Sequence, residues 1–365
     1  MAQRQVSVKE GACLPGEATA LIAASCYSLS YVLLRKGQAE RDLPDHGLFP
    51  VLFISVLTLG ASLALSQLIR PHAFVWNQNS AEAMGYSLLS GLIGTWLGRM
   101  ALYAAIDYVG ATRGVVIKST APLVTLIIAI FLLREKLDDL DATGMVCLLT
   151  GVAVVLLDRN RLQQRGYLNW LRHGAMLGVI AALLQGIGHA MRKLGTLHST
   201  SALLSATVDV TTAFLAYTLW LLASGRLGAI VRTYRRSYTP NIIASAFLSA
   251  AAVLLFFTAV GSAPVSTVSV IIGTEPVLVA ILSALLLRKI ERLTLFTLIG
   301  SLLVALGVIL TSLDQRSADP HKALVVVPPS AQELAPPSPV PLHFNQVNFY
   351  VKRGLTVGGQ EDGAV

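Results

Sequence analysis

The stretch ALYAAIDYVGATRGVVIKSTAPLVTLIIAIFLLR, residues 101–134, returns in altered form later in the chain. Shifted by 154 positions, it lies on LFFTAVGSAPVSTVSVIIGTEPVLVAILSALLLR, residues 255–288. The identical positions include a proline, an arginine and several apolar residues: Ala105/Ala259, Val116/Val270, Ile117/Ile271, Thr120/Thr274, Pro122/Pro276, Ile127/Ile281 and Arg134/Arg288. These matches indicate an internal repeat.

The repeat continues past this stretch after a slip of two residues. The segment GVAVVLLD, which ends at Asp158, lies on GVILTSLD, which ends at Asp314. Three further positions coincide on the way: Glu135/Glu291, Gly144/Gly300 and Gly151/Gly307. Because aligned glycines, prolines and a terminal aspartate arise by chance less easily than aligned leucines, we interpret the chain as two copies of one unit.

The composition excludes most water-soluble classes of protein. Of the 365 residues, 54% are hydrophobic and only 13% are charged, whereas a soluble globular domain carries about 25% charged residues. Apolar runs of about 20 residues recur along the chain, and each is long enough to cross ~30 Å of hydrocarbon as a helix. Ten such windows are predicted to span a membrane: 15–34, 48–69, 84–106, 111–133, 141–157, 173–191, 201–222, 240–260, 265–287 and 294–313.

Each copy of the unit holds five of these windows. The first copy covers residues 15–158 and the second covers 173–314, and their first windows end in similar basic pairs, Arg35-Lys36 and Arg192-Lys193. Because five is odd, the second copy must cross the membrane in the opposite direction to the first. We therefore expect an all-α integral membrane protein of ten transmembrane helices in two inverted five-helix repeats, the architecture of secondary transporters.

Residues 315–365 differ in character from the rest of the chain. They hold seven of its fifteen prolines, including the run PPSAQELAPPSPVP. Such a composition buries too little apolar surface to offset the entropy of ordering. We expect a disordered, Pro-rich tail.

The repeated unit resembles a known family. Residues 101–134, with the glutamate and glycines that follow, are similar to the EamA domain of the drug/metabolite transporter superfamily. TEPVLVAILSALLLRKIERL, residues 274–293, is similar to the C-terminal EamA domain, and the resemblance covers about residues 15–314. It implies an exporter or importer of amino acids, other metabolites or drugs, often driven by an ion gradient, and it identifies the fold better than the substrate.

We therefore expect a secondary transporter that moves a small metabolite or drug-like solute by alternating access, with the solute near the midplane between the repeats. Two alternatives stay open. One is a membrane sensor or scaffold that keeps the fold and signals through its tail. The other is a lipid-intermediate flippase, which needs a laterally open groove rather than an enclosed cavity.

Other classes of function lack support in the sequence. It contains no hydrolase, ATP-binding or metalloprotease motif that indicates an enzyme, and its three scattered cysteines suggest no metal site. We expect no cofactor. The net charge of +8 is spread over short connections, which suits lipid head groups better than nucleic acid. The expected partners are a small solute and the bilayer, and a homodimer stays open.

The charges also bear on orientation in the cell membrane, the expected location of this multi-pass chain. Connections after odd-numbered windows hold fifteen lysines and arginines, and those after even-numbered windows hold five. The positive-inside rule therefore places the odd-numbered connections in the cytoplasm and both termini outside. The resemblance implies the reverse, because members of the family usually keep their termini in the cytoplasm.

Glu275 is the one charge in SVIIGTEPVLVAILSALLL, residues 269–287. A carboxylate deep in a membrane span costs ~2.5–3.5 kcal/mol and is a functional-site hypothesis by default, although a structural hydrogen bond to another helix is the alternative. Pro276 follows it and aligns with Pro122. A proline removes one backbone hydrogen bond and kinks a helix, so both are predicted to bend their helices around a common cavity, unless they serve packing alone.

Lys118 lies one turn before Pro122. At 100° per residue it is ~60° from position 121, which aligns with Glu275. The two side chains therefore point to corresponding sides of their helices, and inversion of the repeats can bring them together. The alternative is that Lys118 extends along its helix to the membrane surface.

Weaker candidates complete the predicted substrate or coupling site. Asp209 lies about eight residues inside its window, whereas Arg99 is close enough to a window end to reach the surface. Trp96 either lines a pocket or has an interfacial or packing role, and His189 is better explained as interfacial than as a proton relay. Family resemblance alone adds two more, Gln185 and Tyr31.

Overall fold

A computed structural model describes residues 16–69, 80–121, 123–124, 139–156, 167–198, 201–236, 239–262, 268, 271–291 and 294–317. They belong to one compact unit that ends at Ala318. Pro122 lies outside the described residues, as does the expected tail beyond Ser317.

The described residues of the first half of the chain are mostly helical. Their bounds are α1 Gly16–Glu40, α2 Leu48–Ile69, α3 Ser80–Ser90, the π-helix η1 Gly91–Gly98, α4 Arg99–Val109, α5 Ala111–Lys118 and α7 Asp139–Leu156. Gly110 separates α4 from α5 with φ 92°, a left-handed conformation that glycine adopts at little cost. The window expected at 84–106 is thus a longer helical segment with a π-helical middle.

The second half follows a similar order. Its helices are α9 Tyr167–His198, α10 Ala202–Ala223, α11 Leu227–Arg236, α12 Pro240–Ser262, α14 Glu275–Leu286 and α15 Leu295–Ser317. Ser201 begins α10 by accepting a hydrogen bond from the backbone N–H of Leu204, as an N-cap serine does. Helix α11 occupies a connection in which the hydropathy pattern predicts no helix.

The chain is an all-helical membrane protein. Six helical segments of the described residues are long and apolar enough to cross a membrane, and three shorter apolar helices accompany them, at 142–156, 275–286 and 295–310. Many large apolar side chains are exposed on these helices, among them Leu57, Leu65, Leu219 and Leu302. Exposed apolar surface on this scale indicates contact with lipid. The count of ten spans is not confirmed.

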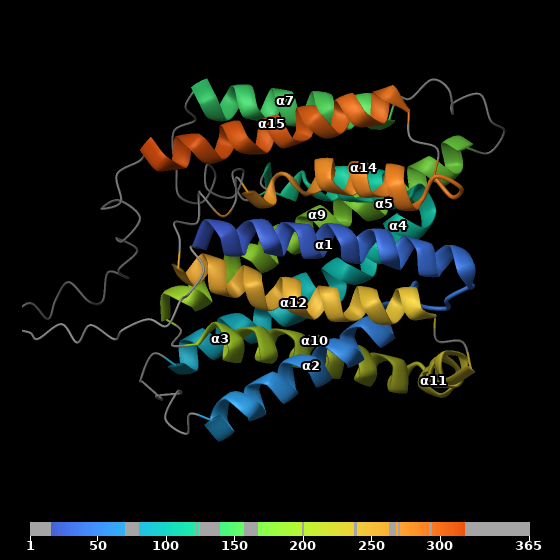
Figure 1. Cartoon of the computed structure of the whole chain (residues 1–365), viewed down its shortest axis with the longest axis vertical. Coiled ribbons are helices and arrows are strands. Elements are labelled where there is room, and N and C mark those ends of the chain that lie inside the picture. The colour runs from blue at the N-terminus through green and yellow to red at the C-terminus, as the bar shows by residue number, and fades with distance from the viewer. Residues whose placement is uncertain are drawn as a thin grey trace, which may run out of the picture. The chain divides into compact units, whose positions relative to one another are not determined.

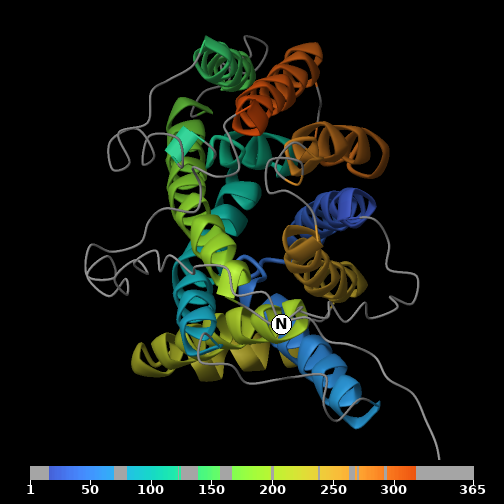
Figure 2. The same ribbon diagram turned by 90° about the vertical axis from the view of Figure 1, so that its left-hand side faces the viewer.

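Helices at corresponding places in the two halves make corresponding contacts. Helix α1 packs on α12 and α14, and its counterpart α9 packs on α3, α4 and α5. Helices α7 and α15 lie side by side at one end of the stack of helices, with α2 and α10 together at the other (Figures 1 and 2). These contacts bring parts of both halves together along the whole stack.

Duplicated glycines explain how closely α7 and α15 approach. A Cβ atom on Gly151 would lie 2.7 Å from the carbonyl oxygen of Gly300, and one on Gly307 would lie 2.6 Å from the backbone nitrogen of Leu148. Each distance is shorter than a real Cβ contact. The glycines shared by the two copies are therefore used where the copies pack against each other.

Candidate functional site

A cavity lies between the two halves of the chain. The first half lines it with Tyr27, Tyr31, Gly94, Arg99 and Lys118. The second half lines it with Gln185, His189, Arg192, Phe256, Ile272 and Glu275. The cavity is narrow in this conformation, with room for little more than a water molecule, so a solute of several atoms must displace side chains to enter.

Both helices that carry the central charges break at the same place in the repeat. After α5 a turn at Ser119 and Thr120 interrupts the helix, and before α14 a turn at Gly273 and Thr274 does so. Each threonine hydroxyl donates to the carbonyl three residues earlier, at 2.8 Å for Thr120 and 2.6 Å for Thr274. The threonine shared by the two copies therefore lies at a helix break in both.

Pro276 stands in the first turn of α14. A proline is tolerated there, because the first backbone N–H groups of a helix have no partner within the helix. In this structure Pro276 thus helps begin a new helix after a break, and it does not bend a continuous one. The cavity meets the end of α5 and the start of α14.

Lys118 and Glu275 face each other across this cavity. The ammonium Nζ lies 2.6 Å from Oε2 of Glu275, and the side chains are only 6% and 2% exposed. Lys118 is the last residue of α5 and Glu275 the first of α14. Both charges therefore also interact favourably with the dipoles of their helices. The structure brings this predicted pair together, whereas its role stays a prediction.

Residues of α1 complete the surroundings of the pair. The Lys118 ammonium lies 5.6 Å from the centre of the Tyr31 ring, within the range of a cation–π interaction. The rings of Tyr27 and Tyr31 stack with centroids 6.0 Å apart. The hydroxyl of Ser28 lies 3.5 Å from the backbone carbonyl oxygen of Glu275. The ion pair thus has an aromatic wall on one side.

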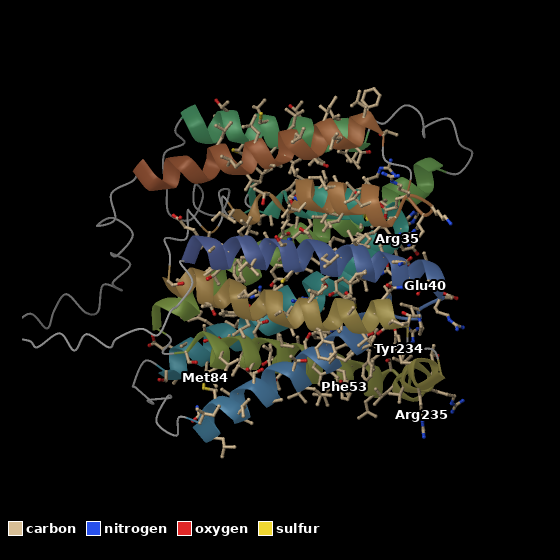
Figure 3. All side chains as sticks on the ribbon, in the orientation of Figure 1. Arg35, Glu40, Phe53, Met84, Tyr234 and Arg235 are labelled. Carbon is tan, nitrogen blue, oxygen red and sulfur yellow. The ribbon has the colours of Figure 1, made fainter. Side chains whose placement is uncertain are left out.

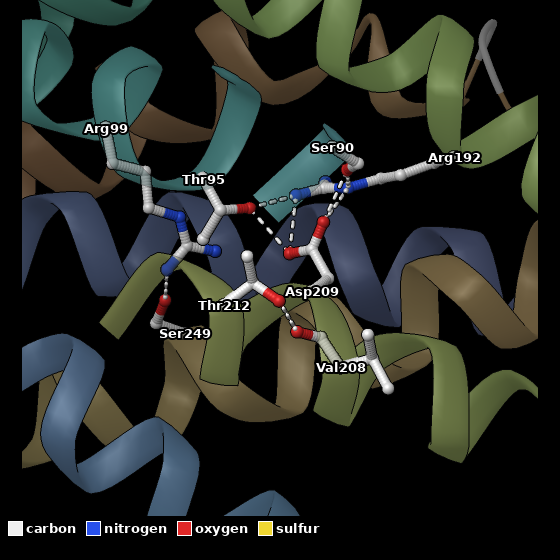
Figure 4. Close-up of polar contacts among 8 residues, drawn as sticks. All are labelled: Ser90, Thr95, Arg99, Arg192, Val208, Asp209, Thr212 and Ser249. Atoms are coloured by element: carbon white, nitrogen blue, oxygen red, sulfur yellow. Dashed lines mark hydrogen bonds and ion pairs between the residues drawn. The ribbon is translucent and has the colours of Figure 1, made fainter. Parts of the chain in front are cut away.

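A second buried ion pair lies beside the cavity. Asp209 is fully buried and accepts hydrogen bonds from Ser90, from Thr95 at 2.6 Å and from Arg192 at 3.2 and 3.3 Å (Figure 4). Arg192 reaches the cavity, and its guanidinium carbon lies 5.5 Å from the centre of the Phe257 ring. Because Ser90 and Thr95 come from the first half, this cluster also joins the halves.

Arg99 is the third buried cation that lines the cavity. It is 6% exposed and donates to the hydroxyl of Ser249 at 2.8 Å (Figure 4). Among the residues that the structure describes, no carboxylate forms an ion pair with it. It begins α4, directly after the π-helix η1.

The remaining predicted residues divide between the cavity and its surroundings. Gln185 lines the cavity and donates to the carbonyl of Gly98 at 3.3 Å. Trp96 packs on the core and is not part of the lining. His189 is not interfacial, because its ring lines the cavity and stacks on Phe256 with centroids 5.3 Å apart.

Arg192 is the functional candidate that sequence reasoning missed. The hydropathy pattern places it in a connection, whereas it lies within α9 and is 5% exposed. A signal was present, since Gln185, His189 and Arg192 are spaced four and three residues apart, as on one face of a helix.

A separate polar cluster lies at one end of the helices. Arg35 contacts Asp107 at 3.0 Å and Glu291 at 3.5 Å, and His46 contacts Asp107 at 2.8 Å. Glu291 also accepts a hydrogen bond from the backbone N–H of Ala111 at 2.6 Å. Burial raises the pKa of the Glu291 carboxyl, although this hydrogen bond and the nearby Arg35 oppose the shift. The cluster therefore connects the first half of the chain to the second at this end of the helices.

Helix α11 is anchored at the same end. Arg35, Glu40, Tyr234 and Arg235 all lie toward it (Figure 3). The hydroxyl of Tyr234 donates to Asp45, which also accepts from the backbone N–H of Phe49 at 2.7 Å. Burial raises the pKa of Tyr234, so the hydroxyl keeps the proton that it donates.

The sequence pattern of the EamA-like transporter family matches this chain twice, over residues 14–157 and 172–313. Each match contains one side of the cavity. The chain belongs to the EamA-like transporter family. Two EamA domains indicate duplicated halves, and membership identifies a transporter of the membrane rather than an enzyme.

Comparison with solved structures supports the fold and gives no further information on function. One solved crystal structure of a protein is 13% identical, with a TM-score of 0.51, and the match covers 83% of this chain and 98% of that chain. No curated protein matches this chain. The described residues contain no group of three or more histidines, cysteines, aspartates or glutamates placed to hold a metal ion.

Proposed function

We propose that this EamA-family chain is a ten-helix secondary transporter of two inverted repeats, residues 15–158 and 173–314, in the cytoplasmic membrane. The matched contacts of α1 and α9 support two related halves. The helix breaks at Thr120 and Thr274 support a functional centre, because secondary transporters bind their solutes at discontinuous helices near the midplane.

The observation that carries the proposal is the buried Lys118–Glu275 ion pair. It joins the two repeats inside the cavity that both repeats line. Charges at this depth are costly, and they mark substrate or ion pathways in membrane proteins. A purely structural helix contact can be made from apolar side chains at lower cost.

Alternating access follows from the way polar clusters join the repeats. When one repeat tilts against the other, contacts across the cavity must separate on one side and form on the other. Lys118 and Glu275 separate if a group of the solute replaces one partner or if a proton neutralises the Glu275 carboxylate. We propose that this exchange couples the bound solute or proton to the movement, with Asp209 and Arg192 holding the neighbouring wall.

Counterflow in vesicles tests the proposal. Purified protein is first screened against small metabolites by thermal shift, since a ligand that binds the folded state raises its melting temperature. The best binder is loaded into proteoliposomes, and entry of the labelled compound is measured. We expect exchange by the whole chain and by a chain that lacks residues 316–365. Loss of exchange in the shortened chain favours the sensor with a signalling tail, and movement of labelled lipid without solute exchange favours the flippase.

A further inference from the structure

The cavity contains more positive charge than its protein partners balance. Arg99, Lys118 and Arg192 line it, and all three are buried. Lys118 is paired with Glu275 and Arg192 with Asp209. Among the residues that the structure describes, three cations and two carboxylates leave one positive charge without an ion-pair partner, that of Arg99.

The hydrogen bond of Arg99 does not compensate this charge. A guanidinium has five N–H donors in a planar fork, and Ser249 accepts one hydrogen bond from it. A hydroxyl is a neutral acceptor, and a buried charge is costly unless it is paired with an opposite charge. Arg99 lines the cavity, so an anion that enters can reach its guanidinium.

The backbone before Arg99 is built in an uncommon way. The π-helix η1 ends at Gly98, directly before Arg99. Such segments are rare and occur often at functional sites. A Cβ atom on Gly98 would lie 2.8 Å from the Gln185 side chain, so the glycine lets the Arg99 segment approach α9 closely.

We infer that Arg99 binds the carboxylate of a small organic anion, and that this anion belongs to the substrate of the proposed transporter. A carboxylate matches the guanidinium fork with two parallel hydrogen bonds. One carboxylate also balances the one unpaired positive charge. Tyr27, Phe256 and Ile272 add an aromatic and aliphatic wall beside the paired charges, so the remainder of the solute is small and has an apolar part. The inference rests on the proposed transport function.

Matched acids and amides test this inference on the unaltered protein. Butyrate is compared with butyramide, and benzoate with benzamide, by thermal shift and calorimetry on the purified full-length chain. The members of each pair have nearly the same shape and differ in charge. We expect the acids to bind and the amides to bind at least ~10-fold more weakly, because only the acids pair with the buried cation. Equal binding of acid and amide overturns the inference, and so does the absence of acid binding.

Variants assign the binding to Arg99. Arg99→Gln is expected to weaken acid binding at least ~30-fold, and Arg99→Lys, which keeps the charge without the fork, is expected to have an intermediate effect. The matched control is Arg232→Gln, an exposed residue of α11, which is expected to bind acids normally. Unchanged acid binding by Arg99→Gln overturns the assignment. If that variant does not fold, the Arg99→Lys result decides.

Counterflow separates this inference from the proposed function. Labelled benzoate or butyrate that binds at Arg99 but does not exchange supports the anion subsite and contradicts transport. Exchange of a neutral or cationic solute, with no acid exchanged, supports transport and contradicts the carboxylate assignment.

Discussion

Lys118 and Glu275 are 157 positions apart in the chain, yet their charged groups lie 2.6 Å apart in the cavity between the repeats. Each stands beside a helix break that occurs in both copies of the repeated unit. The pair therefore occupies the place where the repeat symmetry, the interrupted helices and the buried charge coincide.

The stability of this pair can be measured with a double-mutant cycle. Lys118→Met and Glu275→Gln are each expected to destabilise the protein by about 3–5 kcal/mol, because the partner stays buried without its counter-charge. The double variant is expected to recover much of this loss. Thermal unfolding of the purified proteins gives the coupling energy between Lys118 and Glu275. The control is the same cycle made with two exposed residues that are not paired with each other, Lys289→Met and Glu17→Gln. Additive effects of the two buried substitutions contradict a coupled pair.

Substitution of Asp209 is expected to destabilise the protein as much as substitution of Lys118 or Glu275. Asp209→Asn keeps the shape and removes the charge that balances Arg192, so we expect a loss of about 3–5 kcal/mol of stability and impaired solute exchange. Asp42→Asn, an exposed aspartate in the connection after α1, is the control for unfolding and counterflow. If the Asp209→Asn variant has the same unfolding stability and solute exchange as Asp42→Asn, the Asp209–Arg192 ion pair is dispensable.

Glu291 gives a prediction for pH. Its pKa is raised from 4.5 in the folded protein, mainly by burial, so the folded state holds the proton more tightly than the unfolded state. The contribution of Glu291 to stability is therefore greatest below about pH 4.5 and is lost as the pH rises through the folded pKa. The Glu291→Gln variant lacks this loss.

Melting temperatures of both proteins across this range test the sign. The variant is expected to gain stability relative to the wild type as the pH rises. A relative loss over the same range would mean that the pKa of Glu291 is lowered.

Orientation in the membrane is a fourth prediction. Arg35 and Arg235 lie toward the same end of the helices (Figure 3), which the positive-inside rule places in the cytoplasm. A reporter active only in the cytoplasm is therefore expected to work between α10 and α12 and to be silent after residue 314. The reverse pattern shows that the charge rule fails here and that the termini are cytoplasmic, as is usual in the family.

Much of the fold could be predicted from hydropathy and the repeat. The windows 48–69 and 201–222 fall on α2 and α10 with shifts of at most one residue, because long apolar runs have few other stable states in a bilayer. The repeat also placed Lys118 and Glu275 on corresponding sides of their helices, and this placement predicted that the two residues can come together.

Other features depend on the register of the helices and on the partners of individual side chains, and hydropathy gives no information on either. A charge near a helix end has the same pattern whether it lies in a connection or, like Arg192, is buried against Asp209. The π-helix before Arg99 and the break before Glu275 change the direction of side chains without changing composition. Helix α11 is short and rich in arginine, so a search for apolar windows passes over it.

Counterflow by Glu275→Gln protein tests most directly whether the buried charge pair serves transport. A solute that binds the wild type is exchanged across vesicles at mildly acidic, neutral and mildly alkaline pH, with Glu17→Gln as the exposed control. We expect the control to exchange normally and Glu275→Gln to fall toward the level of protein-free vesicles at every pH. Normal exchange by Glu275→Gln over the whole range would show that the carboxylate is structural and would contradict its role in coupling.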